Sequence, residues 1–245
     1  MKFFDTHCHL DLIKALPEDF KDSESFEKVR KFMIPGVDGE IKNPELFSDN
    51  TRYLKAWGIH PRCVDEDSID KISSFSPMYR AACVGECGLD KYAKAPLELQ
   101  LAVFERQIEL AADLKRPVSV HILGFYRESL ELIKKHSASV SFAMHSWSAS
   151  GELAKEFARA GVYFSFSSLS LRNKKKLAAS FENIPSDRIL LETDAPDQSP
   201  GKDSPEELFY LQTLSSELSR ILKISQGELV NLAFDNACRF FGVSL

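Results

Sequence analysis

The feature that most constrains the fold of this chain is a regular alternation of short apolar runs with longer amphipathic stretches. Such alternation is typical of parallel strands joined by right-handed helical crossovers, and eight runs favour a closed barrel. The runs that we expect to form strands are residues 2–6, 31–37, 53–59, 81–86, 117–122, 139–145, 162–167 and 188–193. An open doubly wound sheet is the alternative, but no glycine-rich phosphate loop in the sequence supports it.

The amphipathic stretches between these runs predict helices. The clearest one places Leu97, Leu101, Phe104, Ile108 and Ala111 on one helical face. Further helices are expected near residues 126–136, 150–160, 172–182, 205–222 and 226–241. The last two follow the eighth strand, and no linker interrupts the chain. The sequence therefore predicts a TIM-type (β/α)8 barrel with additional C-terminal helices, formed by residues 1–245 as a single domain.

Five of the expected strands run into side chains that commonly bind metals. These side chains are His7, His9, Glu86, His121, His145 and Asp194. The carboxyl ends of barrel strands meet at one mouth, where active sites form. A single histidine after a strand is more often a hydrogen-bonded core residue, but the recurrence on five strands favours a metal site. Nitrogen and oxygen ligands of this kind suit Zn, Mn, Fe or Co better than Ca, and the carboxylates also allow Mg.

Spacing adds detail to this metal site. In an extended segment His7 and His9 point to the same side, because side chains alternate with a period of two, and Cys8 then points away. Glu86 lies close to Gly85 and Gly88, which permit close approach of the backbone. A carboxylate can bridge two cations where an imidazole cannot, so Glu86 is the expected bridging ligand.

Composition limits the partners and the compartment. The formal net charge of -5 argues against broad, non-specific coating of nucleic acid. The five cysteines are scattered without a Cys-x-x-Cys pair, which is unlike a disulfide framework or a zinc ribbon. No apolar run approaches the ~18 residues that a membrane span needs. We therefore expect a cytoplasmic protein without a membrane partner, and we interpret Cys83 and Cys87 as packing residues.

The motifs, taken together, resemble the TatD family of metal-dependent hydrolases, within the amidohydrolase-like barrels. The resemblance rests on stretches that follow one another along nearly the whole chain. They are Asp-Thr-His-Cys-His-Leu-Asp at 5–11, Gly-Ile-His-Pro at 58–61, Val-Gly-Glu-Cys-Gly-Leu-Asp at 84–90, Pro-Val-Ser-Val-His at 117–121, Met-His-Ser-Trp-Ser at 144–148, Glu-Thr-Asp-Ala-Pro-Asp at 192–197 and Asn-Ala-Cys-Arg-Phe-Phe at 236–241.

The resemblance implies a site with two divalent cations, of which Zn, Mn and Mg are the candidates. His7, His9 and Asp194 would hold the first cation, with Glu86 bridging to a second that His121 and His145 complete.

It also implies three catalytic residues. Asp194 would take the proton from the attacking water, and Glu86 would hold both cations around it. His60 would contact the substrate or act as an acid, although a turn histidine before a proline is the plainer interpretation.

The positions around the ligands depart from the family pattern. Many members carry an Arg where this chain has Leu123, and the usual basic loop after the eighth strand is replaced by residues 201–206. Phosphodiester recognition depends on Lys and Arg near the phosphate. The remaining candidates for substrate binding are Arg62, Lys91 and Lys202, together with the basic run 172–176, which could equally be a solvated helix start.

Other residues near the ligands have more than one interpretation. Trp147 could stack a base or wall the pocket. Ligating histidines usually donate their second N–H to a carboxylate, and Asp11, Asp90 and Glu192 are the nearest carboxylates in sequence. Helix capping or surface placement would account equally well for Asp11 and Asp90. Thr193 is interpreted as a packing residue.

The leading hypothesis is a two-metal phosphodiesterase, a deoxyribonuclease that acts on single-stranded DNA ends or on a small phosphodiester. A hydrolase of a small amide, ester or lactone is the first alternative, and a non-catalytic binding protein is the second. The sequence leaves the native substrate, the metal, the polarity of cleavage and the oligomeric state open.

Overall fold

The strands form one parallel barrel sheet. The computed structural model describes residues 1–13, 24–36, 38, 41–42, 47–49, 51–74, 81–198 and 210–244. Within these residues the sheet has eight strands in the order β1 to β8, and every neighbouring pair is parallel. The strands are β1 (Phe3–Asp5), β2 (Val29–Pro35), β3 (Tyr53–Trp57), β4 (Cys83–Asp90), β5 (Val118–Leu123), β6 (Phe142–Met144), β7 (Tyr163–Phe166) and β8 (Ile189–Leu191).

Hydrogen bonds just beyond β1 and β8 bring the first and last strands together. Thr6 N donates to Leu191 O over 3.0 Å, and Asp194 N donates to His7 O over 2.9 Å. These bonds place the segments that follow β1 and β8 side by side at the mouth of the barrel. His7 and Asp194, which are far apart in sequence, therefore start from adjacent backbone positions.

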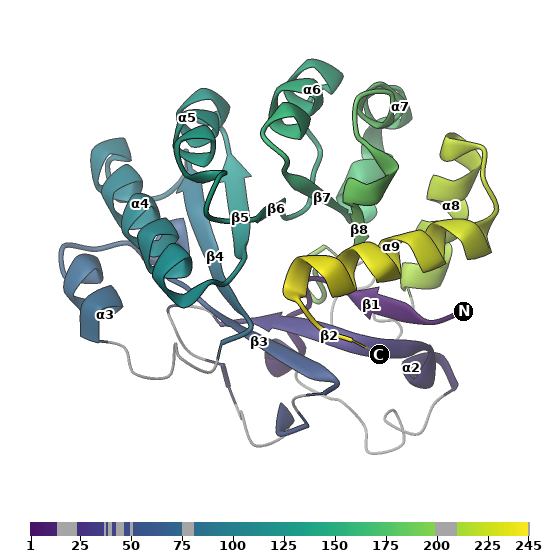
Figure 1. Ribbon diagram of the computed structural model, residues 1–245, viewed down its shortest axis with the longest axis horizontal. Coiled ribbons are helices and arrows are strands. Elements are labelled where there is room, and N and C mark those ends of the chain that lie inside the picture. The colour runs from purple at the N-terminus through teal and green to yellow at the C-terminus, as the bar shows by residue number, and fades with distance from the viewer. Residues whose placement is uncertain are drawn as a thin grey trace.

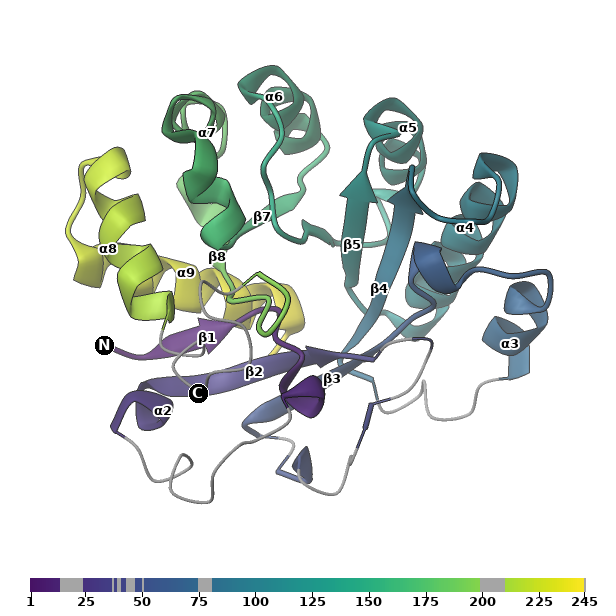
Figure 2. The ribbon, with the colours of Figure 1, turned by 180° about the vertical axis from the view of Figure 1, so that it is seen from behind.

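Helices surround the strands (Figures 1 and 2). They are α2 (Glu24–Lys28), α3 (Ser68–Ser74), α4 (Leu97–Leu114), α5 (Tyr126–His136), α6 (Gly151–Arg159), α7 (Lys174–Phe181), α8 (Tyr210–Leu222) and α9 (Gln226–Phe241). In Figure 1, α3 to α8 lie around the outside of the strands, and α9 passes across one end of the barrel. The predicted barrel with additional C-terminal helices is confirmed.

Helix α9 lies across that end because its apolar face packs against strand residues. Phe234, Phe240 and Phe241 form one buried cluster with Phe4 of β1 and Leu190 of β8. The rings of Phe4 and Phe241 stack with their centroids 5.2 Å apart. The end of the barrel opposite the mouth is thereby filled with apolar side chains.

Side-chain caps account for several helix starts. Ser150 Oγ accepts from Leu153 N at the start of α6, and Ser225 Oγ accepts from Glu228 N at the start of α9. The helix expected at 172–182 begins later than predicted. Residues Ser168–Asn173 form a 3-10 turn (η5), and Asn173 Oδ1 then caps α7 by accepting from Lys176 N.

Two strands extend further than the sequence predicted. The expected fourth strand ended at Glu86 and the fifth directly after His121, whereas β4 continues to Asp90 and β5 to Leu123. The reason is that Gly88 lets the two strands stay paired, since a Cβ at this position would lie 2.0 Å from His121 O. Glu86 and His121 therefore project from within strands rather than from their ends.

None of the described helices has both the length and the apolar character required to cross a bilayer.

Candidate metal centre at the barrel mouth

Glu86 lies at the centre of the imidazoles gathered at the mouth. Its Oε2 is 3.4 Å from His7 Nε2, and its Oε1 is 2.8 Å from His121 Nδ1. The same Oε1 lies 3.6 Å from His60 Nε2 and 3.8 Å from His145 Nε2. The two carboxylate oxygens thus face different sets of imidazoles, as a bridging ligand would.

One donor group combines His7, His9 and Asp194. The Nε2 atoms of the two histidines are 3.4 Å apart, and Asp194 Oδ1 lies 3.7 Å from the first and 3.8 Å from the second. All three side chains are buried. Their donor atoms lie within 4.8 Å of one another, which is close enough for a single ion.

The other donors form two overlapping groups around Glu86. In one, Glu86 is joined by His60 and His121, and in the other by His7 and His145. The rings of His7 and His145 stack with their centroids 3.8 Å apart. His145 therefore lies between the two sides of the centre, and His60 is placed among the candidate ligands as well as at the substrate side.

Three of the imidazoles are suited to bind a cation without losing a proton. Burial is the main cause that lowers the pKa of His7, of His9 and of His145, the last to about 4. His121 differs. Burial opposes its charge, but hydrogen bonds to Asp90 and Glu86 outweigh burial and raise its pKa to about 9.

The two carboxylates at the centre are shifted in opposite directions. Burial, with the nearby charges of Glu192 and Glu86, raises the pKa of Asp194 well above its usual value. Burial acts in the same direction on Glu86, but its contacts with His7 and other imidazoles outweigh burial and hold its pKa well below the usual value. Opposed shifts in neighbouring carboxylates are common where one of them handles a proton.

Carboxylates behind the donor groups lie next to two of the imidazoles, with a hydrogen bond at His121 Nε2 and none at His145 Nδ1. Asp90 Oδ2 lies 3.3 Å from His121 Nε2, and Glu192 Oε1 lies 2.8 Å from His145 Nδ1. Asp11, the third carboxylate suggested by the sequence, instead accepts from Lys42 N. Two of the three expected partners therefore contact an imidazole.

Asp5 is a buried residue that the sequence analysis missed. Its Oδ1 accepts from Thr193 N over 3.0 Å, and its Oδ2 accepts from Thr193 Oγ1 over 2.6 Å. Burial raises the pKa of Asp5 to about 7. Because Thr193 precedes Asp194, these bonds fix the segment that carries one of the candidate ligands, and Thr193 is more than a packing residue.

A cavity of about 350 Å³ opens onto the donor groups. Its polar wall includes His60, Arg62, Glu86 and Asp194. Its other lining residues are Leu12, Ile122, Leu123, Tyr126, Ser146, Ser148, Leu169, Asp197 and Gln198, with His9, His121 and His145. The position where many TatD proteins carry an Arg is thus an apolar part of this wall, at Leu123.

The four predicted substrate residues have different outcomes. Arg62 lines the cavity, and its Nε donates to Asp90 Oδ2 over 2.6 Å. Lys91 is exposed and is not among the lining residues; its ammonium lies 4.9 Å from the ring centroid of Tyr92. Lys202 lies outside the residues that the structure describes.

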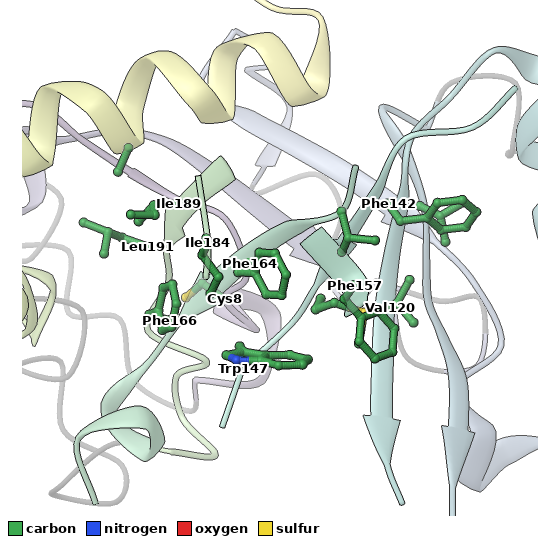
Figure 3. Close-up of a cluster of buried hydrophobic side chains, with 14 of the residues drawn as sticks. Cys8, Val120, Phe142, Trp147, Phe157, Phe164, Phe166, Ile184, Ile189 and Leu191 are labelled. Carbon is green, nitrogen blue, oxygen red and sulfur yellow. The ribbon is translucent and has the colours of Figure 1, made fainter. Parts of the chain in front are cut away.

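Trp147 is too buried to stack a base at the metal cavity, and of its two interpretations the structure favours a wall residue, because it lines a smaller neighbouring cavity. Its side chain is only 3% exposed, and it packs edge-on against Phe157 and Phe164 with ring centroids 5.6 and 5.0 Å away (Figure 3). Its indole N–H donates to Ser180 Oγ over 3.3 Å. The backbone turns the ring into the core, because Ser146 adopts a positive φ directly after His145.

The donor chemistry fits a divalent cation. Imidazole nitrogens and carboxylate oxygens converge from several strands, and the Nε2 atoms of His7 and His9 lie 3.4 Å apart at the centre. The Nδ1 atoms of His7, His9 and His145 have no hydrogen-bond partner among the described residues. Mixed nitrogen and oxygen ligation suits Zn, Mn or Fe, and carboxylates also serve Mg.

Comparison with known proteins shows the family of this chain. The metal-dependent hydrolase YabD of Bacillus subtilis, which is described as uncharacterized, is 28% identical over 255 residues, covering 98% of this chain and 99% of that protein. Human deoxyribonuclease TATDN3 is 27% identical over 260 residues, covering 97% of this chain and 93% of that protein. The fold matches the crystal structure of the Escherichia coli TatD homologue YJJV with a TM-score of 0.79 at 23% identity, covering 99% of this chain and 98% of that one. Residues 4–242 match the family described as TatD related DNase, and the chain belongs to this family.

Proposed function

We propose that this TatD-family chain is a metal-dependent hydrolase that cleaves phosphodiesters at the ends of single-stranded DNA. The observation that carries the proposal is the pair of donor sets that share Glu86, with the Arg62 guanidinium on the wall of the same cavity. Two cations and a guanidinium are well matched to the charge of a transferring phosphoryl group. The name of human TATDN3 as a deoxyribonuclease supports the same substrate class.

His7, His9 and Asp194 would hold one divalent cation, and His121 and His145 a second, with one oxygen of Glu86 directed to each side. When bound, such cations lower the pKa of water and neutralise charge on the phosphoryl oxygens.

Asp194 is the proton acceptor in this proposal. Its Oδ1 faces His7 and His9, and its Oδ2 lies 3.5 Å from His145 Nε2, so the carboxylate borders both donor sets. Burial raises its pKa, and a raised pKa makes a carboxylate a stronger base for the proton of an attacking water.

His60 acts as a neutral hydrogen-bond donor. Its Nδ1 accepts from Arg62 N over 3.1 Å, so the ring proton resides on Nε2, which faces the cavity near Glu86. Burial lowers the pKa of His60 to about 4, and the ring is therefore uncharged at neutral pH. From this position it can donate to a phosphoryl or leaving-group oxygen.

Hydrolysis of a small uncharged ester, amide or lactone is the alternative on the same site. The observation that favours it is the apolar side of the cavity, where Leu123, Tyr126 and Leu169 lie, together with the acidic Asp197. A polyanionic substrate would have to avoid this side and bind along the wall that carries Arg62.

The test compares substrates and metals on one preparation. The purified chain is stripped of metal, reloaded separately with Mg, Mn or Zn, and assayed on single-stranded DNA with free 3′ ends, on bis(p-nitrophenyl) phosphate and on a lactone. We expect cleavage of both phosphodiesters with at least one metal and none by Asp194→Asn. Turnover of the lactone with no cleavage of either phosphodiester would replace the proposal with its alternative, and full activity of Asp194→Asn would reject the role of that residue.

A further inference from the structure

A second cavity lies beside the metal centre, at the start of α7. It has a volume of about 170 Å³. Ser148 and Leu169 line both this cavity and the one over the metal centre, so the two are neighbours along the mouth. In Figure 2, α6 and α7 stand side by side next to β7, and the second cavity is lined by residues of η5 and α7 and of the segment that precedes α6.

The charged side chains that line this cavity are both cations. Arg172 and Lys176 line it, are exposed, and form no ion pair with any described residue. Asn173 uses its Oδ1 to cap α7, which leaves its side-chain amide N–H groups without a role in the cap. The hydroxyls of Ser170 and Ser180 are already engaged with backbone carbonyls.

No acidic side chain is among the residues that line the second cavity, whereas Glu86, Asp194 and Asp197 line the first. Other cations of the same run are placed differently: Lys174 pairs with Glu217 over 2.9 Å, and Lys175 is not a lining residue. The positive charge of residues 172–176 is therefore divided: Arg172 and Lys176 line the cavity, and Lys174 and Lys175 do not. The positive end of the α7 dipole adds to the same field.

We infer that this cavity is a second phosphate subsite, which holds the phosphate next to the scissile one in a single-stranded DNA substrate. The inference rests on the proposed function for the identity of the substrate. The subsite would add positive charge beside a metal cavity whose wall is apolar at Leu123, because Arg172 and Lys176 line the neighbouring cavity. Arg172 and Lys176 contact the phosphate, and Asn173 donates from its amide.

The main experiment removes the two charges and compares a matched loss of charge on the same helix. Arg172→Ala/Lys176→Ala is the test variant, and Lys174→Ala/Lys175→Ala is the control. For a thymidine trinucleotide we expect KM to rise about tenfold in the test variant, as two charge-assisted contacts would produce at an exposed site, and less than about twofold in the control. Turnover of bis(p-nitrophenyl) phosphate, which has a single phosphate, should stay unchanged in both. Equal losses in test and control variants, or an equal loss on the single-phosphate substrate, would overturn the inference.

A chemical change in the substrate locates the contact. A neutral methylphosphonate is placed at the linkage next to the scissile one. We expect the methylphosphonate to raise the KM of the wild type as much as the double substitution does. It should cause no further rise in the KM of Arg172→Ala/Lys176→Ala. The same comparison is made for a terminal 5′-phosphate. If the double substitution cancels the effect of that phosphate and not the effect of the internal linkage, the cavity binds a strand end and our assignment to the adjacent linkage is wrong.

A binding measurement separates this inference from the proposed function. The anisotropy of a labelled single-stranded oligonucleotide is measured on the metal-free protein over a range of salt concentrations. Because Arg172 and Lys176 contact a single phosphate, the double substitution should reduce the salt slope by about 0.7. A protein that binds in this way but cleaves no phosphodiester would refute the proposed function and leave the subsite standing. If the protein cleaves DNA but the salt slope of the variant equals that of the wild type, the proposed function stands and the subsite is refuted.

Discussion

The Nε atom of Arg62 lies 2.6 Å from Oδ2 of Asp90, and the same oxygen lies 3.3 Å from Nε2 of His121. Asp90 is fully buried, so one carboxylate oxygen links a residue on the wall of the cavity to a candidate metal ligand. The bond to Asp90 keeps the proton of His121 on Nε2 and leaves Nδ1 directed at Glu86.

Asp90→Asn tests this link. An amide of the same shape keeps the packing but removes the charge that holds His121 and Arg62 in place. We expect activity and metal affinity to fall about 10- to 100-fold, which is the usual effect of losing a partner of a metal-binding histidine. Activity is measured on bis(p-nitrophenyl) phosphate, and affinity by titration of the metal-free protein. Unchanged metal affinity would show that Asp90 does not position His121.

Arg62 itself should act on substrate binding rather than on the metals. The Arg62 side chain is 55% exposed, and its Nε is fixed by Asp90. Its terminal N–H groups are therefore available to a phosphate. We expect Arg62→Ala to raise KM for single-stranded DNA about tenfold with little change in metal affinity. Arg62→Lys keeps the charge but loses the fixed orientation, and it should recover only part of the affinity. Full recovery by Lys would mean that charge alone matters at this position.

Metal binding should release a proton from His121. The pKa of His121 is raised to about 9, so this ligand is protonated in the metal-free protein at neutral pH and must be deprotonated to coordinate a cation. We expect calorimetry in buffers of different ionisation enthalpy to show about one more proton released at pH 8 than at pH 10. Asp90→Asn removes a negative charge and weakens one of the two hydrogen bonds that raise this pKa, so it should reduce the release at pH 8. The same release at both pH values would contradict the assignment.

The same shift predicts the stability of the metal-free protein. Because the folded pKa is raised, the charged His121 stabilises the fold fully below its ordinary pKa of about 6.5, and this contribution is lost as the pH rises through about 9. The melting temperature of the metal-free wild type should therefore fall towards that of Asp90→Asn over this interval.

The aromatic residue that contacts a base should be Tyr126 and not Trp147. Tyr126 is half-buried in the wall of the metal cavity, whereas Trp147 is packed against Phe157 and Phe164. We expect Tyr126→Leu to raise KM for single-stranded DNA, with an upper bound set by the ~1–3 kcal/mol of a base–aromatic stack. Trp147→Leu should raise KM less than Tyr126→Leu does and lower the free energy of unfolding by about 2–5 kcal/mol, as loss of a buried aromatic ring does. KM and denaturant unfolding are measured on both variants, and the opposite pattern would restore Trp147 as the stacking residue.

The ligand-type residues could be found from the sequence because each belongs to a local pattern. The alternation of side chains places His7 and His9 together, and an apolar run before a histidine or a carboxylate marks the mouth of a barrel. The six residues found in this way lie within reach of one another in the structure. Their binding of two cations stays a prediction.

Asp90 and Glu192 could be predicted as candidate partners of histidines, but which residues they meet could not, because these contacts join distant parts of the chain. Asp90 meets Arg62 across 28 positions and His121 across 31, and Asp5 meets Thr193 across 188. The direction of Trp147 depends on the positive φ of Ser146 and on the packing of α6 and β7 around the ring. Neither a motif nor a periodicity contains this information.

Gly88 sets the distance between β4 and β5, and with it the geometry of Glu86 and His121. Its φ is +146°, and a Cβ built on it would lie 2.0 Å from the carbonyl oxygen of His121. Gly88→Ala must therefore push the two strands apart or strain the backbone. We expect the free energy of unfolding to fall by about 2–4 kcal/mol and the metal to bind more weakly.

Gly227→Ala is the matched control for this last prediction. Gly227 lies in the first turn of α9, and nothing lies within 4 Å of the Cβ that the substitution adds. Because Ala is a better helix former than Gly, this variant should be as stable as the wild type or more stable by up to about 1 kcal/mol, with unchanged metal affinity. Denaturant unfolding and metal titration of both variants check the contrast. If Gly88→Ala binds metal as tightly as Gly227→Ala, the close pairing of β4 and β5 does not control the metal centre.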